Sequence, residues 1–190
     1  MNPTLIAKGT RLILDGLGLD LADPNLEDTP DRVVEVYREV CYGLDDLDKK
    51  IAIILSKSFP CTSPSLVVAK DVEVFSLCPH HLLPVHYSIC VGYLPGEDNS
   101  RVLGISKLCR LVKVLGSRPV LQEQLMHDVT AALMTIDGCV GAGCIGKGWH
   151  LCMSMRGVAQ SKASIVASSL KGEFLTDPTV RAEFMQLFRG

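Results

Sequence analysis

Two short segments concentrate the side chains that can bind a metal ion. The first is Cys78-Pro79-His80-His81, and the second is His150-Leu151-Cys152. A thiolate and an imidazole at such spacing can face one ion, and a distant cysteine can supply a third donor. Zinc held by two cysteines and one histidine, with water in an open fourth position, is a known catalytic arrangement. Such a water loses a proton near neutral pH and becomes a nucleophile.

The same segments allow two other interpretations. Their residues are ordinary buried side chains, or they form a closed structural zinc site with a fourth ligand such as Cys144. A Cys-x-x-His pair alone is a weak signal of metal binding. However, His80 and His150 lie beside the candidate ligands without being needed as ligands. The segments are also far apart in the sequence, so the fold must assemble the site, as it does in most enzymes.

Charged residues between the two metal segments suggest an anion site. Ser106-Lys107-Leu108-Cys109-Arg110 places two cations on one face of a helix, near its start. Backbone N–H groups at a helix start also favour anions. Gln122 and Glu123 follow near the start of the next predicted helix. A solvated basic face and a surface carboxylate are the commoner meanings of such residues, so alone they decide nothing.

Apolar periodicity predicts the elements that must bring these residues together. The helical patterns cover residues 4–18, 28–43, 106–116, 118–136 and 177–188. The strand patterns cover residues 65–78, 85–96, 101–105 and 161–174, and residues 139–158 are expected to form two strands around a Gly146–Gly148 turn. Residues 44–64 read as a short helix or turn followed by a loop, and residues 97–100 as a turn. Because strands and helices are grouped, we expect an α+β fold with an antiparallel sheet.

The composition excludes several classes of protein. The chain has 190 residues, 47% of them hydrophobic and 21% charged, as in a globular domain with a small helical extension. A formal net charge of -2 gives no basic excess for wrapping nucleic acid. No apolar run reaches the ~20 residues that span a bilayer. Charged residues interrupt the N-terminal apolar residues, so we expect no secretory signal and a soluble, cytoplasmic protein. Most of the 8 cysteines lie in apolar strings, where buried free thiols are the default.

Taken together, the motifs resemble the GTP cyclohydrolase I family. The resemblance runs from about residue 27 to the C-terminus and rests on six ordered blocks, which are EDTPDRV, FSLCPHH-LLP, GISKLCRLV, RPVLQEQL, HLCMSMRGV and RAEF. Six blocks in order are far more specific than any one of them. Residues 1–26 suit the variable helical N-terminus of that family.

This resemblance implies a fold, an assembly and a reaction. The family has the tunnelling fold, in which antiparallel strands of several subunits form a β-barrel with helices on one face of the sheet. Five subunits form a ring, two rings stack into a homodecamer, and active sites lie between subunits. Residues 1–60 would then be the helical N-terminal region and residues 61–190 the catalytic domain. The implied reaction takes GTP and water to formate and 7,8-dihydroneopterin triphosphate.

The resemblance also assigns the metal and proton-transfer residues. Cys78, His81 and Cys152 match the Zn²⁺ ligands of the family, which activate the water that attacks C8 of guanine. His80 and His150 match its acid/base histidines, and the ordinary pKa of histidine suits proton transfer near neutral pH.

A further set of matches concerns the substrate. Glu123 matches the carboxylate that accepts guanine N1–H and the 2-amino group, and Gln122 lies beside it in the pocket. Ser106 would contact the ribose or a phosphate. The matches to the residues that hold the triphosphate are Lys107, Arg110 and Arg156.

The sequence departs from the usual family pattern at several positions. Pro79 stands where Glu is common, His86-Tyr87 replaces a Gly-containing turn, and Gln124 occupies a position that is often Arg. The segment 161–174 lacks the usual threonine-rich run. Two alternatives therefore stay open, which are a related tunnelling-fold enzyme acting on another purine or pterin, and a catalytically silent metal-binding paralogue.

Overall fold

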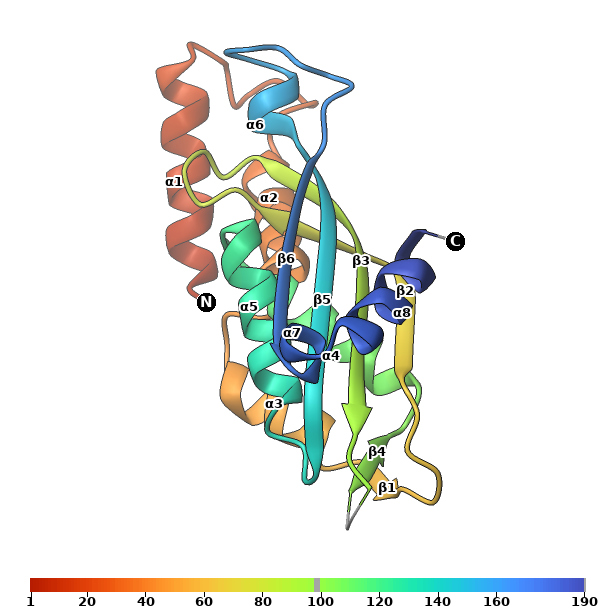
Figure 1. Ribbon diagram of the computed structural model, residues 1–190. Coiled ribbons are helices and arrows are strands. Elements are labelled where there is room, and N and C mark those ends of the chain that lie inside the picture. Colours follow the sequence, from red (N-terminus) through yellow and green to blue (C-terminus); the bar gives the residue numbers. More distant parts are fainter. Residues whose placement is uncertain (98–99, 190) are drawn as a thin grey trace.

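Four strands with β-branched and alternating sequences form the central sheet. The computed structural model describes residues 1–97 and 100–189 (Figure 1). Within them, every neighbouring pair of strands in this sheet is antiparallel, and the order is β2 (Val67–Leu77), β3 (Pro84–Pro95), β5 (Cys139–His150) and β6 (Ile165–Gly172). The predicted α+β class with an antiparallel sheet is thus confirmed.

One face of the sheet packs against two helices, α4 (Ser106–Gly116) and α5 (Gln122–Leu133). Alternate residues of β3 point into this core and are fully buried, because side chains alternate along a strand; they are Val85, Tyr87, Ile89, Val91 and Tyr93. The helices contribute apolar stripes with the i, i+3 and i+4 spacing of an amphipathic helix, among them Leu111, Leu125, Val129 and Leu133. This core fixes α5 against the sheet and so positions its first residues.

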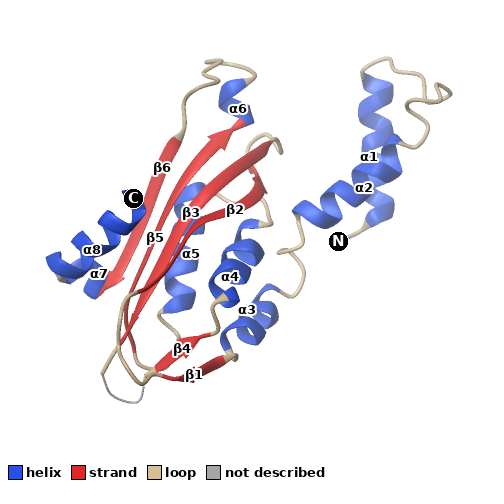
Figure 2. Cartoon of the chain, turned by 90° about the vertical axis from the view of Figure 1, so that its right-hand side faces the viewer, coloured by secondary structure: helices blue, strands red, loops and turns tan. Residues whose placement is uncertain are grey.

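Helices cover both faces of the sheet, which corrects the prediction of helices on one face. α7 (Glu173–Thr176) and α8 (Pro178–Arg189) lie across the face opposite α4 and α5 (Figure 2). There Phe174 and Phe184 pack edge to face, 5.0 Å apart, over Cys90 and Ile145. The strands are therefore apolar on both sides over part of their length, which alternation alone does not reveal.

Residues 139–150 form one continuous strand, so the predicted pair of strands around a Gly146–Gly148 turn is wrong. The glycines allow close packing instead of a turn. A Cβ on Gly143 would lie 2.4 Å from the Phe174 ring, and one on Gly146 would lie 2.7 Å from Met126 Cε. After β5 the chain enters the short helix α6 (Leu151–Ser154) and then a loop to β6.

The N-terminal segment is helical, as expected. α1 (Pro3–Gly16) and α2 (Thr29–Val40) pack on one another and lie to one side of the sheet, which α2 contacts at β2 (Figure 2). α3 (Leu47–Leu55) follows, and β1 (Ser58–Pro60) then pairs with β4 (Arg101–Leu103) in a small second sheet. The turn expected at 97–100 includes residues 98–99, which lie outside the described residues. None of the helices in the described part of the chain has the length and apolarity that crossing a bilayer demands.

Candidate metal centre

The connection between β2 and β3 places two of the predicted metal ligands. The carbonyl of Cys78 accepts hydrogen bonds from the N–H groups of His81 (3.3 Å) and Leu82 (2.8 Å), and its own N–H donates to Leu83 (2.9 Å). Leu82 has a left-handed backbone with φ 53. Pro79 fits this tight turn because it needs no N–H donor there. The turn brings the side chains of Cys78 and His81 to one side.

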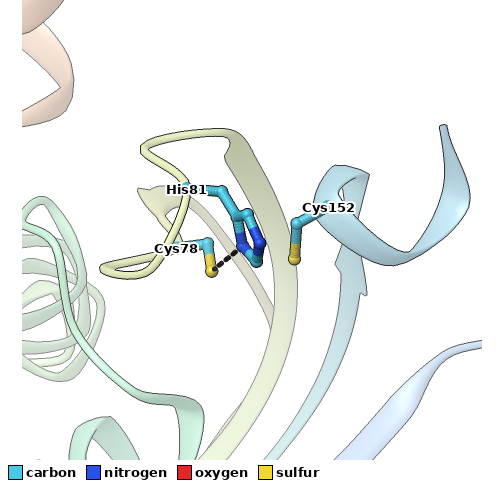
Figure 3. Close-up of side chains that lie close together, drawn as sticks. All are labelled: Cys78, His81 and Cys152. Atoms are coloured by element: carbon cyan, nitrogen blue, oxygen red, sulfur yellow. Dashed lines mark hydrogen bonds between the residues drawn. The ribbon is translucent and has the colours of Figure 1, made fainter. Parts of the chain in front are cut away.

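The third predicted ligand comes from the end of β5. β3 lies between β2 and β5, and Val85 pairs with His150, so β5 ends beside the β2–β3 turn. Cys152 follows in α6 and turns its sulfur toward the other two side chains (Figure 3). One ligand atom from each of Cys78, His81 and Cys152 lies within 4.8 Å of the others. The structure therefore brings together all three residues.

The spacing of these donors suits a tetrahedral ion. Cys78 Sγ lies 3.6 Å from His81 Nδ1. A tetrahedral zinc with ordinary Zn–S and Zn–N bonds separates its sulfur and nitrogen ligands by about 3.6 Å. Cys78 is buried, Cys152 is half-buried and His81 is exposed, so the cluster is open on one side.

A closed four-ligand site is not what the structure forms. Among the described residues, the group that could hold a metal contains three donors and no fourth. Cys144, the fourth ligand considered above, is fully buried in the core with its sulfur 3.4 Å from Met126 Sδ. Burial strongly raises the pKa of the Cys144 thiol. Cys144 is thus a core residue and does not belong to the donor cluster.

Arg156 makes a contact that constrains His81. The guanidinium lies 2.8 Å from His81 Nε2, and it can only donate. Nε2 must therefore accept, which leaves the ring proton on Nδ1, the nitrogen that faces Cys78. A metal bound at Nδ1 would place the proton on Nε2 and remove this acceptor. The contact places the Arg156 guanidinium beside the donor cluster.

His150 is two residues from the candidate ligand Cys152, and its side chain is half-buried. Its Nε2 is 2.9 Å from Gln122 Oε1, and its ring packs edge to face on Tyr87 at 5.9 Å. Burial lowers the pKa of His150, and the negative charge of Glu123 opposes that shift. Glu123 is therefore near enough to act on the ring. His80 is exposed, with its ring 6.2 Å from that of His81.

Tyr87 is a residue of this region that the sequence did not single out as functional. Its side chain is fully buried, and within the described residues its hydroxyl has no hydrogen-bond partner. Burial, followed by the charges of Cys78, Glu123 and Cys152, raises its pKa. On the opposite face of the sheet, Phe75, His86 and Trp149 stack across three strands, with ring centroids 4.8 Å and 5.6 Å apart.

The predicted triphosphate residues of α4 lie far from the metal donors within one chain. Ser106, Lys107 and Arg110 belong to the start of α4, next to β4 and the small sheet, whereas the donors lie at the other end of the central sheet (Figure 1). Arg110 lines a cavity of about 850 Å³ whose other cations are Arg38, Lys50 and Lys113. A single chain thus holds the metal donors and these cations in two separate places.

An antiparallel α+β fold with an open Cys-His-Cys donor set and a hydrogen-bonded histidine beside it is the arrangement of an enzyme that could use a bound metal ion to activate water. The family model of GTP cyclohydrolase I matches residues 6–189. The chain belongs to the GTP cyclohydrolase I family.

Individual relatives agree with this assignment. A GTP cyclohydrolase 1 of Bifidobacterium longum is 41% identical over 182 residues, covering 96% of this chain and 88% of that protein. The GTP cyclohydrolase 1 of Thermoanaerobacter pseudethanolicus is 38% identical, and that of Clostridium perfringens is 35% identical, each over 96% of this chain. The crystal structure of the archaeosine synthase QueF-Like in the apo form aligns with a TM-score of 0.45 at 20% identity, covering 58% of this chain and 97% of that one, a similarity too low to support any conclusion.

Proposed function

We propose that this protein hydrolyses GTP, opening the imidazole ring of guanine to give formate and 7,8-dihydroneopterin triphosphate. The observation that carries the proposal is the meeting of Cys78, His81 and Cys152 within 4.8 Å, in a chain that belongs to the GTP cyclohydrolase I family. His150 and Glu123, which the family reaction requires as acid/base and base-reading groups, are proposed to complete the site: His150 is hydrogen-bonded to Gln122, and the charge of Glu123 acts on its ring.

Zn²⁺ is the ion that we propose for the cluster, held by Cys78, His81 and Cys152. Two sulfurs and one imidazole are donors that zinc prefers, whereas magnesium and calcium prefer oxygen. When bound, zinc supplies Lewis acidity and lowers the pKa of water in its open position. Burial and the neighbouring Cys78 raise the pKa of Cys152, so metal binding would displace a proton.

His80 and His150 are proposed to move the protons of the reaction. The lowered pKa of His150 keeps its ring neutral near pH 7, ready to accept a proton. His80 is exposed at the mouth of the cluster, where an incoming nucleotide can reach it. Glu123 is proposed to read the base, because a carboxylate can accept from guanine N1–H and the 2-amino group together. Gln122 precedes Glu123 at the start of α5.

We further propose that the triphosphate is held by residues of two copies of the chain. Arg156 lies at the cluster of its own chain, while Ser106, Lys107 and Arg110 lie at the opposite end of the sheet. A homodecamer of two stacked pentameric rings, as in the family, would bring these ends of neighbouring chains together. Within the described residues the sheet has β2 and β6 as its edge strands, which supports closure into a barrel across subunits.

The domain division and the cellular location stay proposals of the same kind. We assign residues 1–60 to a helical N-terminal region and residues 61–190 to the catalytic domain, although β1 ties the end of the first to β4 of the second. Each of the cysteines is a free thiol, which supports a reducing compartment such as the cytoplasm.

The test is release of formate from GTP by the purified, zinc-loaded protein, together with the ultraviolet spectrum of a pterin product. Cys152→Ala should lose metal and formate release together. Cys109→Ala is the matched control, because that thiol is exposed on α4, outside the cluster, and should keep both. A wild-type protein that binds zinc but releases no formate would favour a related enzyme of another purine or pterin. A silent paralogue would show neither product nor any effect of GTP on the metal site.

A further inference from the structure

The side chain of Gln122 forms hydrogen bonds with other residues of the same chain. It is the first residue of α5 and only 3% exposed. Its Nε2 donates to the carbonyl of Gly146 at 2.8 Å and to the carbonyl of Ile165 at 3.0 Å. These carbonyls belong to the adjacent strands β5 and β6. Both amide hydrogens of Gln122 are therefore used to bridge α5 to two strands.

These two contacts fix which end of the amide faces His150. Turning the amide over would place its oxygen against two carbonyl oxygens, which cannot donate. The amide oxygen must therefore point to the third neighbour, His150 Nε2, at 2.9 Å. An amide oxygen can only accept, so Nε2 of His150 must carry a hydrogen in both the neutral and the protonated ring.

The surroundings hold both side chains in this arrangement. The Tyr87 ring packs on the edge of the His150 ring at an interplanar angle of 81°. Gly148 leaves the necessary space, because a Cβ there would lie 2.6 Å from Gln122 Oε1 and 2.7 Å from Tyr87 Cε1. The neighbouring pair Tyr87 and Gly148 is in register across β3 and β5. The amide therefore has little freedom to choose another partner.

We propose that Gln122 is a positioning residue for His150, which holds the ring hydrogen on Nε2 and fixes the orientation of the imidazole. This assignment rests on the proposed function for the identity of the substrate, but not for the tautomer. It gives the amide of Gln122 a role other than direct contact with the purine.

The tautomer can be measured without turnover. In zinc-loaded protein labelled with ¹⁵N-histidine, solid-state NMR should show His150 with Nε2 protonated and Nδ1 bare above the pKa of the ring. The resonances are assigned by comparison with His150→Asn. Gln122→Leu should lose this preference. Gln124→Leu is the matched control on the same helix, because Gln124 is exposed and donates instead to Asp128.

Kinetics separate positioning from substrate binding. Gln122→Leu should lower kcat for formate release by about 100-fold, as expected when a general acid/base loses its orientation, while zinc content and GTP affinity stay within about 3-fold of wild type. Gln122→Met, which is closer in shape, gives the same comparison if the Leu variant folds poorly.

Three results would overturn the inference. These are a wild-type His150 protonated on Nδ1, a tautomer that Gln122→Leu leaves unchanged, or a variant whose GTP affinity falls while its kcat does not. A wild-type enzyme without formate release would instead overturn the proposed function, and the NMR result would still decide the tautomer.

Discussion

Each donor of the cluster owes its position to a local feature of the backbone. Cys78 and His81 are held by a turn whose carbonyl and N–H groups satisfy one another, and Cys152 is held by the strand-to-helix junction after β5. The donor types and the Cys-x-x-His spacing could be read from the sequence. The hydrogen bonds of the Gln122 amide and the burial of the Tyr87 hydroxyl could not be predicted from the sequence, because both depend on the register of β3, β5 and β6.

Glu123→Ala should keep the metal and weaken GTP use. The carboxylate is proposed to accept two hydrogen bonds from guanine, and loss of a charged acceptor costs about 1.5–3 kcal/mol, or about 10- to 100-fold in affinity. Metal analysis and steady-state kinetics with GTP test this expectation. Gln124→Ala, one residue along α5, should change neither quantity. Normal kinetics for Glu123→Ala would show that the base is read by another group.

Gly148→Ala should disturb the site through packing alone. The new Cβ would lie 2.6 Å from Gln122 Oε1, so either the amide or the Tyr87 ring must shift. Overpacking of this kind costs about 1–3 kcal/mol of stability, and activity should fall with it. Gly9→Ala in α1 has open space around it and should instead stabilise the protein by about 0.5–1 kcal/mol. Chemical denaturation at equal protein concentration compares the variants. An unchanged Gly148→Ala enzyme would mean that the strands separate easily there.

At the scale of elements, the sequence predicted most helices and the strands with β-branched alternation. It failed at β5, where glycines resemble a turn but serve close packing against Phe174 and Met126. The helix predicted at 177–188 is confirmed as α8, but nothing in the local pattern of 173–189 tells which face of the sheet α7 and α8 will cover. These are choices made by tertiary packing, which periodicity does not contain.

Gly172→Ala should be the more damaging of two glycine changes near β6. Gly172 has φ 56 and a Cβ there would lie 2.1 Å from the carbonyl oxygen of Val140, so both the backbone and the pairing of β5 with β6 are strained. A loss of at least about 2 kcal/mol is expected. Gly157 has φ 60 but open space, and Gly157→Ala should lose only about 1 kcal/mol. Equal losses, measured by thermal unfolding, would show that the contact with Val140 relaxes freely.

At the scale of the whole molecule, several apolar side chains are exposed to solvent in the single chain. On α1 alone, Leu5, Leu12 and Ile13 are each more than 60% exposed. This outward stripe, the α1–α2 pair to one side of the sheet and the open sheet edges agree with the proposed assembly. The sequence showed the stripe as an amphipathic pattern, but it could not show which of its faces lies against α2.

The folded protein should lose stability in alkaline solution. Burial raises the pKa of Cys90 from 9.0 to about 11, and burial also raises the pKa of Cys41, Cys139 and Tyr93. The folded state holds these protons more tightly than the unfolded state does. The contribution of these groups to the free energy of unfolding is therefore complete below about pH 9 and is lost as pH rises toward 11. Cys90→Ala should flatten this decline by about 1–2 kcal/mol. Urea unfolding at a series of pH values tests it, and an identical slope in the variant would refute the assignment.

The position of the cluster has a mechanical consequence. Cys78 directly follows β2 and Cys152 lies just after β5, and these strands are not neighbours, since β3 lies between them. An ion bound by both sulfurs would link the ends of β2 and β5, with β3 between them. It would also close the chain segment between Cys78 and Cys152 into a loop. Chelation should therefore speed amide hydrogen exchange at that end of β2, β3 and β5, and leave the end beside β1 and β4 unchanged. An ion bound there for the proposed chemistry would thus also hold this end of the sheet together.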